Sequence, residues 1–353
     1  MKEAGTLDSK ELDTSITQMM ADWPVPGLAV AIVQDDAVIF ARGYGTHRLG
    51  ESLPVDEDTI FPVASVTKAF TATSLAMLVD DGRLSLDDRV VQHLPHIQLY
   101  DPWVTCEMRV RDLLCHRSGL ATFGGDLLWY GTRYSRDEVL HRIRYLPPAS
   151  SFRSEFGYQN VMYLAAGMIV AAITGEEWDA FVHDRIFGPL GMRRSTTSIS
   201  ALAGEDNLVS AHTTRSDPPQ RVAHLNMDNC APAGAINSTA RDLAQWLRLQ
   251  LGRGTYEGRQ LFSSALAREM WNAHTPLVVT EEIERLAPST HFVAYGLGWG
   301  MRDYHGRKLL EHTGGLPGIS TYVGFMPEAN VGLVALTNSD TALPLAAARS
   351  IFD

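Results

Sequence analysis

The chain has 353 residues, of which 45% are hydrophobic and 20% charged, and its formal net charge at pH 7 is −11. This length predicts two lobes or two domains, and the negative charge argues against nucleic acid or an anionic membrane as the main partner. No apolar stretch reaches the roughly 18 residues of a membrane-spanning helix. The first residues lack the apolar core of a signal peptide. We therefore expect a cytoplasmic protein, or one exported with a signal peptide that this chain lacks.

The first predicted elements are a helix, a hairpin and a second helix. Residues 8–23 carry apolar side chains at helical spacing. Two strands at 27–34 and 37–44 flank Asp35 and Asp36, a pattern typical of a hairpin. The helix that contains Ser65 then ends near Gly82, because glycine is common just after a helix.

The middle of the chain is predicted to be helical and its end to be rich in strands. Helices are expected within residues 110–116, 136–145, 158–174, 178–186 and 241–251, and strands at 295–301, 309–312, 320–325 and 331–337. A last helix is expected from Ala342, and the polar, proline-containing residues 213–221 predict an exposed loop. Strands at both ends with helices between them indicate an α/β (α+β) fold, in which a mostly helical lobe is inserted into a sheet built from both termini.

Lys68 is the residue that first points to a function. It is one of four lysines and interrupts an apolar run that begins at Phe61. Because an isolated buried ammonium is very costly, such a lysine must be paired or must lose its proton. Ser65 lies three residues earlier, on the same face of a helix. A serine hydroxyl beside an amine of lowered pKa is an activated nucleophile with its base, so we expect an enzyme.

Three motifs then stand in the order of a known family. Residues 65–68 (SVTK) resemble the SxxK motif of serine β-lactamases and penicillin-binding proteins. Residues 158–160 (YQN) resemble the YxN motif, and residues 312–315 (HTGG) resemble the KTG-type strand motif with histidine in place of lysine. Longer phrases typical of the class C-type branch, which includes D-aminopeptidases and family VIII-type esterases, lie at residues 63–90, 113–120, 186–192, 232–247 and 295–300.

The resemblance covers essentially the whole chain and implies a β-lactamase/transpeptidase-like fold. It implies a single catalytic domain over residues 1–353, with an antiparallel sheet flanked by helices. The α/β lobe would comprise residues 1–62 and 225–353, and the helical lobe residues 63–224. Relatives of this type often continue into a small β-barrel-like domain, so we expect the native protein to extend beyond Asp353.

The resemblance also assigns roles in acyl transfer. Ser65 would be the nucleophile, and Lys68 and Tyr158 are the two candidate bases; which of them acts in acylation stays open. Tyr158 would also relay the proton to the leaving group. The N–H groups of Ser65 and Gly315 would form the oxyanion hole, where losing one donor costs about 100- to 1000-fold in rate.

Four residues are expected to bind the substrate: Asn160, His312, Thr313 and Gly314. Asn160 would donate to the substrate and hold Lys68. A lysine at position 312 would be a permanent cation suited to a substrate carboxylate, whereas histidine is mostly neutral at pH 7. We therefore expect a D-amino-acid peptidase, amidase or esterase for small-molecule or peptide substrates, with β-lactams as slow acylating ligands.

The alternatives are a β-lactamase, a D-Ala-D-Ala carboxypeptidase or a penicillin-binding sensor that does not turn over. Lys68 and Tyr158 argue against the sensor, because a stalled acyl-enzyme needs no second base. No Gly-x-Ser-x-Gly nucleophile elbow is present. No cofactor and no metal are expected, since the three cysteines lack metal-finger spacing. Five aromatic residues are expected to pack rather than to line subsites, namely Phe123, Trp129, Tyr130, Trp299 and Tyr322. The oligomeric state is not predicted.

Overall fold

The computed structural model describes residues 9–23, 25–216 and 218–353. Its centre is an eight-stranded antiparallel sheet with the strand order β2-β1-β14-β13-β12-β11-β10-β9. Two strands come from the beginning of the chain and six from its end: β1 (Gly27–Gln34), β2 (Ala37–Gly45), β9 (Thr275–Leu277), β10 (Val293–Tyr295), β11 (Gly300–Tyr304), β12 (Arg307–Leu316), β13 (Ile319–Met326) and β14 (Val331–Thr337). The sheet built from both termini is therefore confirmed.

The two ends of the chain meet where β1 pairs with β14. The register runs from Leu28 opposite Thr337 to Gln34 opposite Val331. β1 is an unbroken apolar run and is buried along almost its whole length. Such a strand needs cover on both faces of the sheet.

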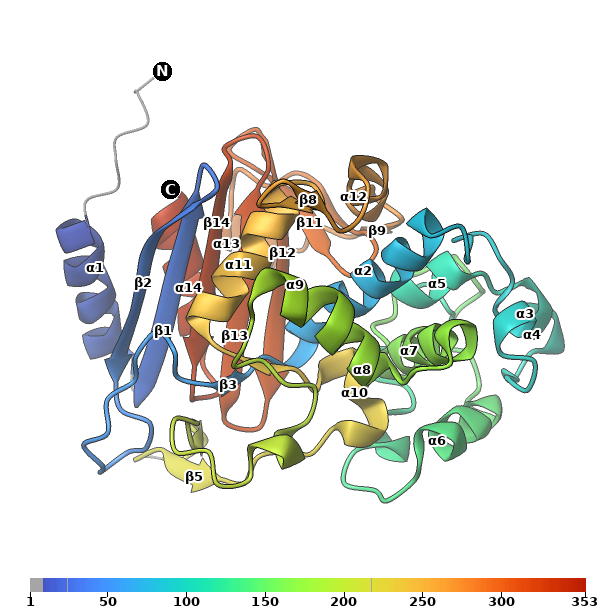
Figure 1. Ribbon diagram of the computed structural model, residues 1–353, viewed down its shortest axis with the longest axis horizontal. Coiled ribbons are helices and arrows are strands. Elements are labelled where there is room, and N and C mark those ends of the chain that lie inside the picture. The colour runs from blue at the N-terminus through green and yellow to red at the C-terminus, as the bar shows by residue number, and fades with distance from the viewer. Residues whose placement is uncertain (1–8, 24, 217) are drawn as a thin grey trace.

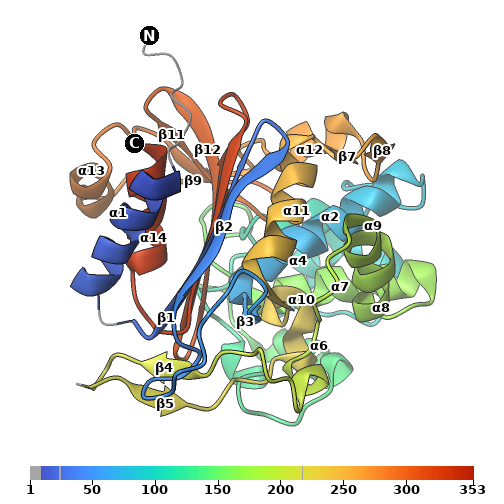
Figure 2. The same cartoon turned by 60° about the vertical axis from the view of Figure 1, so that its left-hand side comes forward.

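Helices supply that cover on both faces. On one face lie α1 (Ser9–Asp22) and α14 (Leu343–Phe352), and on the other lies α11 (Ala240–Leu251), with most of the remaining helices beyond it (Figures 1 and 2). The short α13 (Glu281–Leu286) lies on the side of α1 and α14 (Figure 2). α1 buries Leu12 and Ile16. The N-terminus of α11 is capped by Thr239, whose side chain accepts from the Asp242 N–H.

The helical part of the molecule is organised around α2 (Thr67–Asp80). All twelve residues from Thr67 to Leu78 are buried, and a helix that is apolar on every side belongs inside a protein. It contacts α7 (Asn160–Thr174), α8 (Trp178–Val182) and α10 (Ala231–Gly234). The other α-helices are α3 (Val90–His93), α4 (Pro102–Glu107), α5 (Val110–Leu114), α6 (Arg136–Arg142), α9 (Gly188–Leu190) and α12 (Ser264–Met270).

Short elements complete the fold. Three two-stranded ladders pair β3 (Phe61–Pro62) with β6 (Asn237–Ser238), β4 (Ala211–Thr213) with β5 (Gln220–Val222), and β7 (Thr255–Tyr256) with β8 (Arg259–Gln260). Single turns of tighter or wider helix lie at η1 (Ala64–Val66), η2 (Asp126–Leu128), η3 (Ile143–Tyr145), η4 (His183–Phe187), η5 (Ile199–Leu202) and η6 (Asp228–Cys230). Within the described ranges no helix is both long and apolar enough to cross a membrane.

Two local predictions were wrong in detail. Residues 295–301 do not form one strand, because residues 296–299 make the turn between β10 and β11, where Gly298 has φ +79°. A Cβ on Gly298 would lie 3.0 Å from the Lys68 carbonyl oxygen, so this turn packs against α2. The predicted loop at 213–221 carries strand pairing at its edges, and Asp217 within it lies outside the described residues. The predicted first residue of the first helix, Asp8, also lies outside them.

Candidate active site

Ser65 stands in η1, the tight turn that leads into α2, rather than in the helix itself. It is half-exposed within an otherwise buried run. The preceding Ala64 has φ +50°, a strained conformation of a kind often found at functional sites. A Cβ on Gly314 of β12 would lie 2.3 Å from the Val63 carbonyl oxygen and 3.1 Å from the Cβ of Ala64. Glycine is therefore needed at position 314 for β12 to lie against the turn that presents Ser65.

Lys68 is fully buried beside Ser65. Its Nζ lies 3.2 Å from the Ser65 Oγ, 2.7 Å from the Asn160 Oδ1 and 2.8 Å from the Ala233 carbonyl oxygen. Burial lowers the pKa of Lys68 to about 7, although the charge of Asp126 opposes this shift. Close to neutral pH, a large share of the enzyme therefore carries an uncharged amine at this position.

The hydrogen bonds of the Lys68 amine leave its lone pair directed at Ser65. A neutral amine keeps two N–H donors and one lone pair. The Asn160 Oδ1 and the Ala233 carbonyl oxygen are acceptors only, so each takes one of the two N–H groups. The lone pair then faces the Ser65 hydroxyl, which lies within hydrogen-bonding range. This arrangement can accept the Ser65 proton.

Asn160 is held by a carboxylate that the sequence analysis missed. Its Nδ2 donates to the Asp126 carboxylate at 3.0 and 3.1 Å, and the indole of Trp129 also donates to Asp126, at 3.0 Å. The amide nitrogen is thus directed to Asp126, whereas we expected it to donate to a substrate. A lone carboxylate in the apolar stretch Asp-Leu-Leu-Trp-Tyr is the one sequence signal that could have drawn attention to Asp126.

Tyr158 lies just before α7, because the helix that was predicted from residue 158 begins at Asn160. The Lys68 Nζ stands 4.7 Å from the centre of its ring. Burial of the phenol raises its pKa above the ordinary value, and the Ser65 hydroxyl offsets only part of this shift. A phenolate is therefore disfavoured near neutral pH. Of the two candidate bases, Lys68 is the one whose environment favours the deprotonated form.

His312 is buried on β12 with both ring nitrogens in use. Its Nδ1 lies 2.7 Å from the Thr313 carbonyl oxygen, which can only accept, so Nδ1 carries the proton. Its Nε2 therefore accepts from the Tyr295 hydroxyl at 2.8 Å. Burial, followed by the charge of Lys68, lowers the pKa of His312 to about 3. Tyr295, a second residue that was missed as an individual site residue, occupies the second nitrogen of this neutral imidazole.

The end of β12 has a free edge. β11 pairs with β12 only as far as Glu311, opposite Gly300, whereas β12 continues to Leu316. Thr313 and Gly315 are exposed there. A Cβ on Gly315 would meet nothing within 4 Å, so the space beside it is open. The structure thus brings Thr313, Gly314 and Gly315 beside Ser65, Lys68, Tyr158 and Asn160.

The aromatic residues near the site divide into two groups. Trp129, Trp299 and Tyr322 are buried, as predicted. Phe123 and Tyr130 are 58% and 47% exposed, so the packing prediction was wrong for both. Phe123 has φ +60° and its N–H donates to the Tyr158 carbonyl oxygen at 2.8 Å. This backbone contact keeps the Phe123 ring 5.5 Å from the Tyr158 ring, at the rim of the site.

The chain is similar to several known proteins. The profile of the Beta-lactamase family matches residues 12–353. The unguisins hydrolase of Aspergillus violaceofuscus is 29% identical over 96% of this chain, and this chain spans 63% of its length. Penicillin-binding protein 4 of Amycolatopsis lactamdurans is 30% identical over 90% of this chain and 82% of its own. The solved D-amino acid amidase of Ochrobactrum anthropi SV3 has the same fold, with a TM-score of 0.78 and 23% identity over 97% of this chain and 96% of its own.

Proposed function

This chain belongs to the β-lactamase family, and we propose that it is a serine hydrolase that forms an acyl-Ser65 intermediate from amides or esters. The favoured substrates are D-amino-acid amides, short peptides with an N-terminal D-residue, and simple esters. The neutral state of His312 is the observation that carries this choice. A hydrolase for substrates with a carboxylate beside the scissile bond would need a cation at that position.

The acylation step uses the neutral Lys68. Its lone pair takes the Ser65 proton while the Oγ attacks the substrate carbonyl carbon. The negative charge that develops on the carbonyl oxygen would be stabilised by the N–H groups of Ser65 and Gly315. The proton then passes through the Tyr158 phenol to the leaving amine or alkoxide, which departs as the neutral molecule. Tyr158 suits this relay because its raised pKa keeps it a proton donor.

Deacylation would follow the same path in reverse. A water molecule takes the place of the leaving group and gives a proton, through Tyr158, to Lys68. The hydroxide attacks the acyl carbon, the bond to the Ser65 Oγ breaks, and the Oγ takes the proton back from Lys68. The acid is released and the enzyme returns to its starting state, so no external co-reactant other than water is needed.

Substrate choice would be made at β12. The free edge beyond Glu311 can pair with the extended backbone of a peptide. Next to it, His312 offers a neutral ring whose two nitrogens are already occupied. A carboxylate there would lose its water shell without gaining a charged partner, and unpaired charges are costly to bury.

A matched pair of substrates tests this proposal. D-Alanine p-nitroanilide and the D-alanine amide of 5-amino-2-nitrobenzoic acid share an acyl group and differ by one carboxylate on the leaving group. We expect wild-type kcat/KM to be about tenfold or more higher for the first, the equivalent of one missing charge-assisted contact. Ser65→Ala should release neither chromophore.

The alternatives correspond to other outcomes of the same assay. A preference for the carboxylate-bearing amide, or a chromogenic cephalosporin as the fastest substrate, would favour a β-lactamase or a D-Ala-D-Ala carboxypeptidase. A single stoichiometric burst without turnover of any substrate would favour a penicillin-binding sensor. Equal turnover by Ser65→Ala would contradict the acyl-Ser65 mechanism itself.

A further inference from the structure

His116 is a fully buried histidine that the proposed reaction does not use. It follows α5 and has φ +58°, a conformation that is uncommon for residues other than glycine and is retained only where neighbouring contacts enforce it. Its ring packs against the ring of Tyr158, with the ring centres 4.3 Å apart and the ring planes inclined by 35°. A residue with a strained backbone that packs against a candidate catalytic side chain is itself a candidate for a functional role.

The contacts of His116 bracket Tyr158 on both sides. The His116 carbonyl oxygen accepts from the Gly157 N–H at 2.9 Å. Its Nδ1 accepts from the Gln159 N–H at 3.0 Å. Both chain neighbours of Tyr158 are thus bonded to one residue, whose ring also packs against the Tyr158 ring. His116 therefore holds the residues on either side of Tyr158 and packs against its ring, while the N–H and the carbonyl oxygen of Tyr158 itself bond to Thr122 and Phe123.

The chemical state of His116 agrees with this arrangement. Because Nδ1 accepts a hydrogen bond, a neutral ring carries its proton on Nε2. Burial, and then the charge of Lys68, lowers the pKa of His116 well below its ordinary value, so the ring stays neutral. Nε2 has no hydrogen-bond partner within the described part of the chain. It lies in an aromatic enclosure formed with Tyr163 and Tyr295, whose ring centres are 5.3 and 4.5 Å away.

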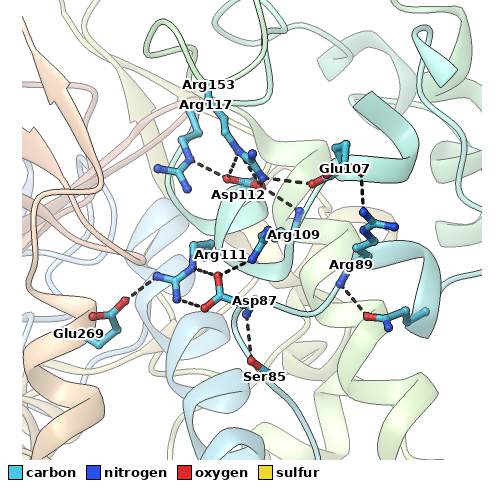
Figure 3. Close-up of polar contacts among 11 residues, drawn as sticks. Ser85, Asp87, Arg89, Glu107, Arg109, Arg111, Asp112, Arg117, Arg153 and Glu269 are labelled. Carbon is cyan, nitrogen blue, oxygen red and sulfur yellow. Dashed lines mark hydrogen bonds and ion pairs between the residues drawn. The ribbon is translucent and has the colours of Figure 1, made fainter. Parts of the chain in front are cut away.

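Ion pairs to the buried Asp112 hold the loop that contains His116. The fully buried Asp112 carboxylate accepts from the Arg117 Nε at 2.7 Å and from the Arg153 Nη2 at 2.6 Å (Figure 3). The Arg153 N–H also donates to the Arg117 carbonyl oxygen at 2.9 Å. These contacts join the loop that contains His116 to the loop that leads to Tyr158, at the residue that follows His116.

We propose that His116 is a positioning residue for Tyr158, which it holds at the height and tilt that let the phenol pass a proton to the leaving group. This inference rests on the proposed function, because it gives Tyr158 the task of proton transfer. It assigns His116 no contact with the substrate.

Two variants separate the contacts of His116. His116→Asn can keep an acceptor near the Nδ1 position and tolerates a positive φ, but it removes the ring. His116→Phe keeps a ring against Tyr158 but leaves the Gln159 N–H without its acceptor. His47→Asn is the control, since His47 is also buried and bonded to Thr59 rather than to this site.

The decisive readout compares two leaving groups. D-Alanine p-nitroanilide needs a proton on its leaving amine, whereas D-alanine p-nitrophenyl ester releases a stable phenolate without one. We expect His116→Asn to lower kcat/KM for the anilide, which reports acylation and not the shared deacylation step, about 10- to 100-fold, a part of the roughly 100- to 10,000-fold that general acid–base catalysis contributes. The loss of kcat/KM should be at least about tenfold smaller for the ester, whose leaving group needs no proton. In a Tyr158→Phe background, His116→Asn should have no further effect on the anilide.

The outcomes distinguish three cases. Equal losses for ester and anilide, or a full additional loss in the Tyr158→Phe background, would overturn the positioning role. If His116→Asn does not fold, the same comparison with His116→Phe decides, and its thermal unfolding is measured beside that of His47→Asn. Unchanged activity in Ser65→Ala would instead reject the proposed function, whatever the His116 variants do.

Discussion

Replacing Asp126 with asparagine should move the acid limb of the pH–rate profile toward lower pH. The carboxylate stabilises the protonated form of Lys68, because opposite charges attract, and it therefore raises the pKa of that amine. Asparagine removes the charge but keeps an oxygen that can accept from Asn160. The geometry around Lys68 should thus survive while its proton is held less tightly.

The size of the shift follows from the contacts. Lys68 and Asp126 are joined through the Asn160 amide by hydrogen bonds of 2.7 and 3.0 Å, which places the two charges about 7 Å apart. At that separation the attraction is about 1 to 2.5 kcal/mol for an effective dielectric constant between about 40 and 20, which corresponds to about one to two pKa units. From a pKa of about 7, the acid limb should move to about 6 or below.

The assay is kcat/KM for D-alanine p-nitroanilide between pH 5 and 9, which reports groups of the free enzyme. At pH 6 the neutral fraction of Lys68 would rise from about one tenth to about one half, so Asp126→Asn should be about fivefold faster there and nearly unchanged at pH 8. Asp137→Asn, an exposed carboxylate on α6, is the matched control. An acid limb that stays in place, or one that moves toward alkaline pH, would refute the assignment of this limb to Lys68.

Two further predictions concern packing. Gly314→Ala should abolish most activity and destabilise the fold by about 1 to 3 kcal/mol, because the added Cβ would lie 2.3 Å from the Val63 carbonyl oxygen. Gly315→Ala is the control, since a Cβ at that position meets open space, and it should melt at the same temperature as wild type. Equal melting temperatures of the two variants would contradict the close approach at Gly314. Asp112→Asn should cost about 1 to 3 kcal/mol in urea unfolding, because it removes the charge from a fully buried carboxylate that accepts from Arg117 and Arg153. Asp87→Asn, whose side chain is 53% exposed, should cost less than about 1 kcal/mol; similar losses would show that burial of Asp112 is unimportant.

Local spacing correctly predicted that the Ser65 and Lys68 side chains meet. Residues three apart share a helical face, and the Ser65 and Lys68 side chains do meet at 3.2 Å. The apolar composition around Lys68 also indicated a lowered pKa, because burial of a charge depends mostly on what surrounds it. Even so, Ser65 lies in a tight turn before the helix, a distinction that depends on contacts with β12 rather than on the neighbouring sequence.

Contacts between distant segments could not be predicted in this way. Asp126 meets Asn160 across a separation of 34 residues, and no local motif marks which amide atom will face which partner. His312 was expected to be neutral, yet only the fold reveals that Tyr295 occupies its second nitrogen. His116 illustrates the same limit, because its role depends on two loops that lie together only after folding.

The pairing of β1 with β14 has a consequence for the synthesis of the protein on the ribosome. The Gly27 N–H donates to the Asn338 side chain, 311 residues further along the chain, and the Val63 carbonyl oxygen accepts from the Thr321 hydroxyl, 258 residues later. Contacts of such long range make folding slow and leave apolar surfaces open to aggregation in the meantime. A nascent chain therefore displays its reactive serine long before the strand that must lie beside it has been translated. Activity is delayed until nearly the last strand has emerged, and we expect the growing chain to depend on chaperones during that interval.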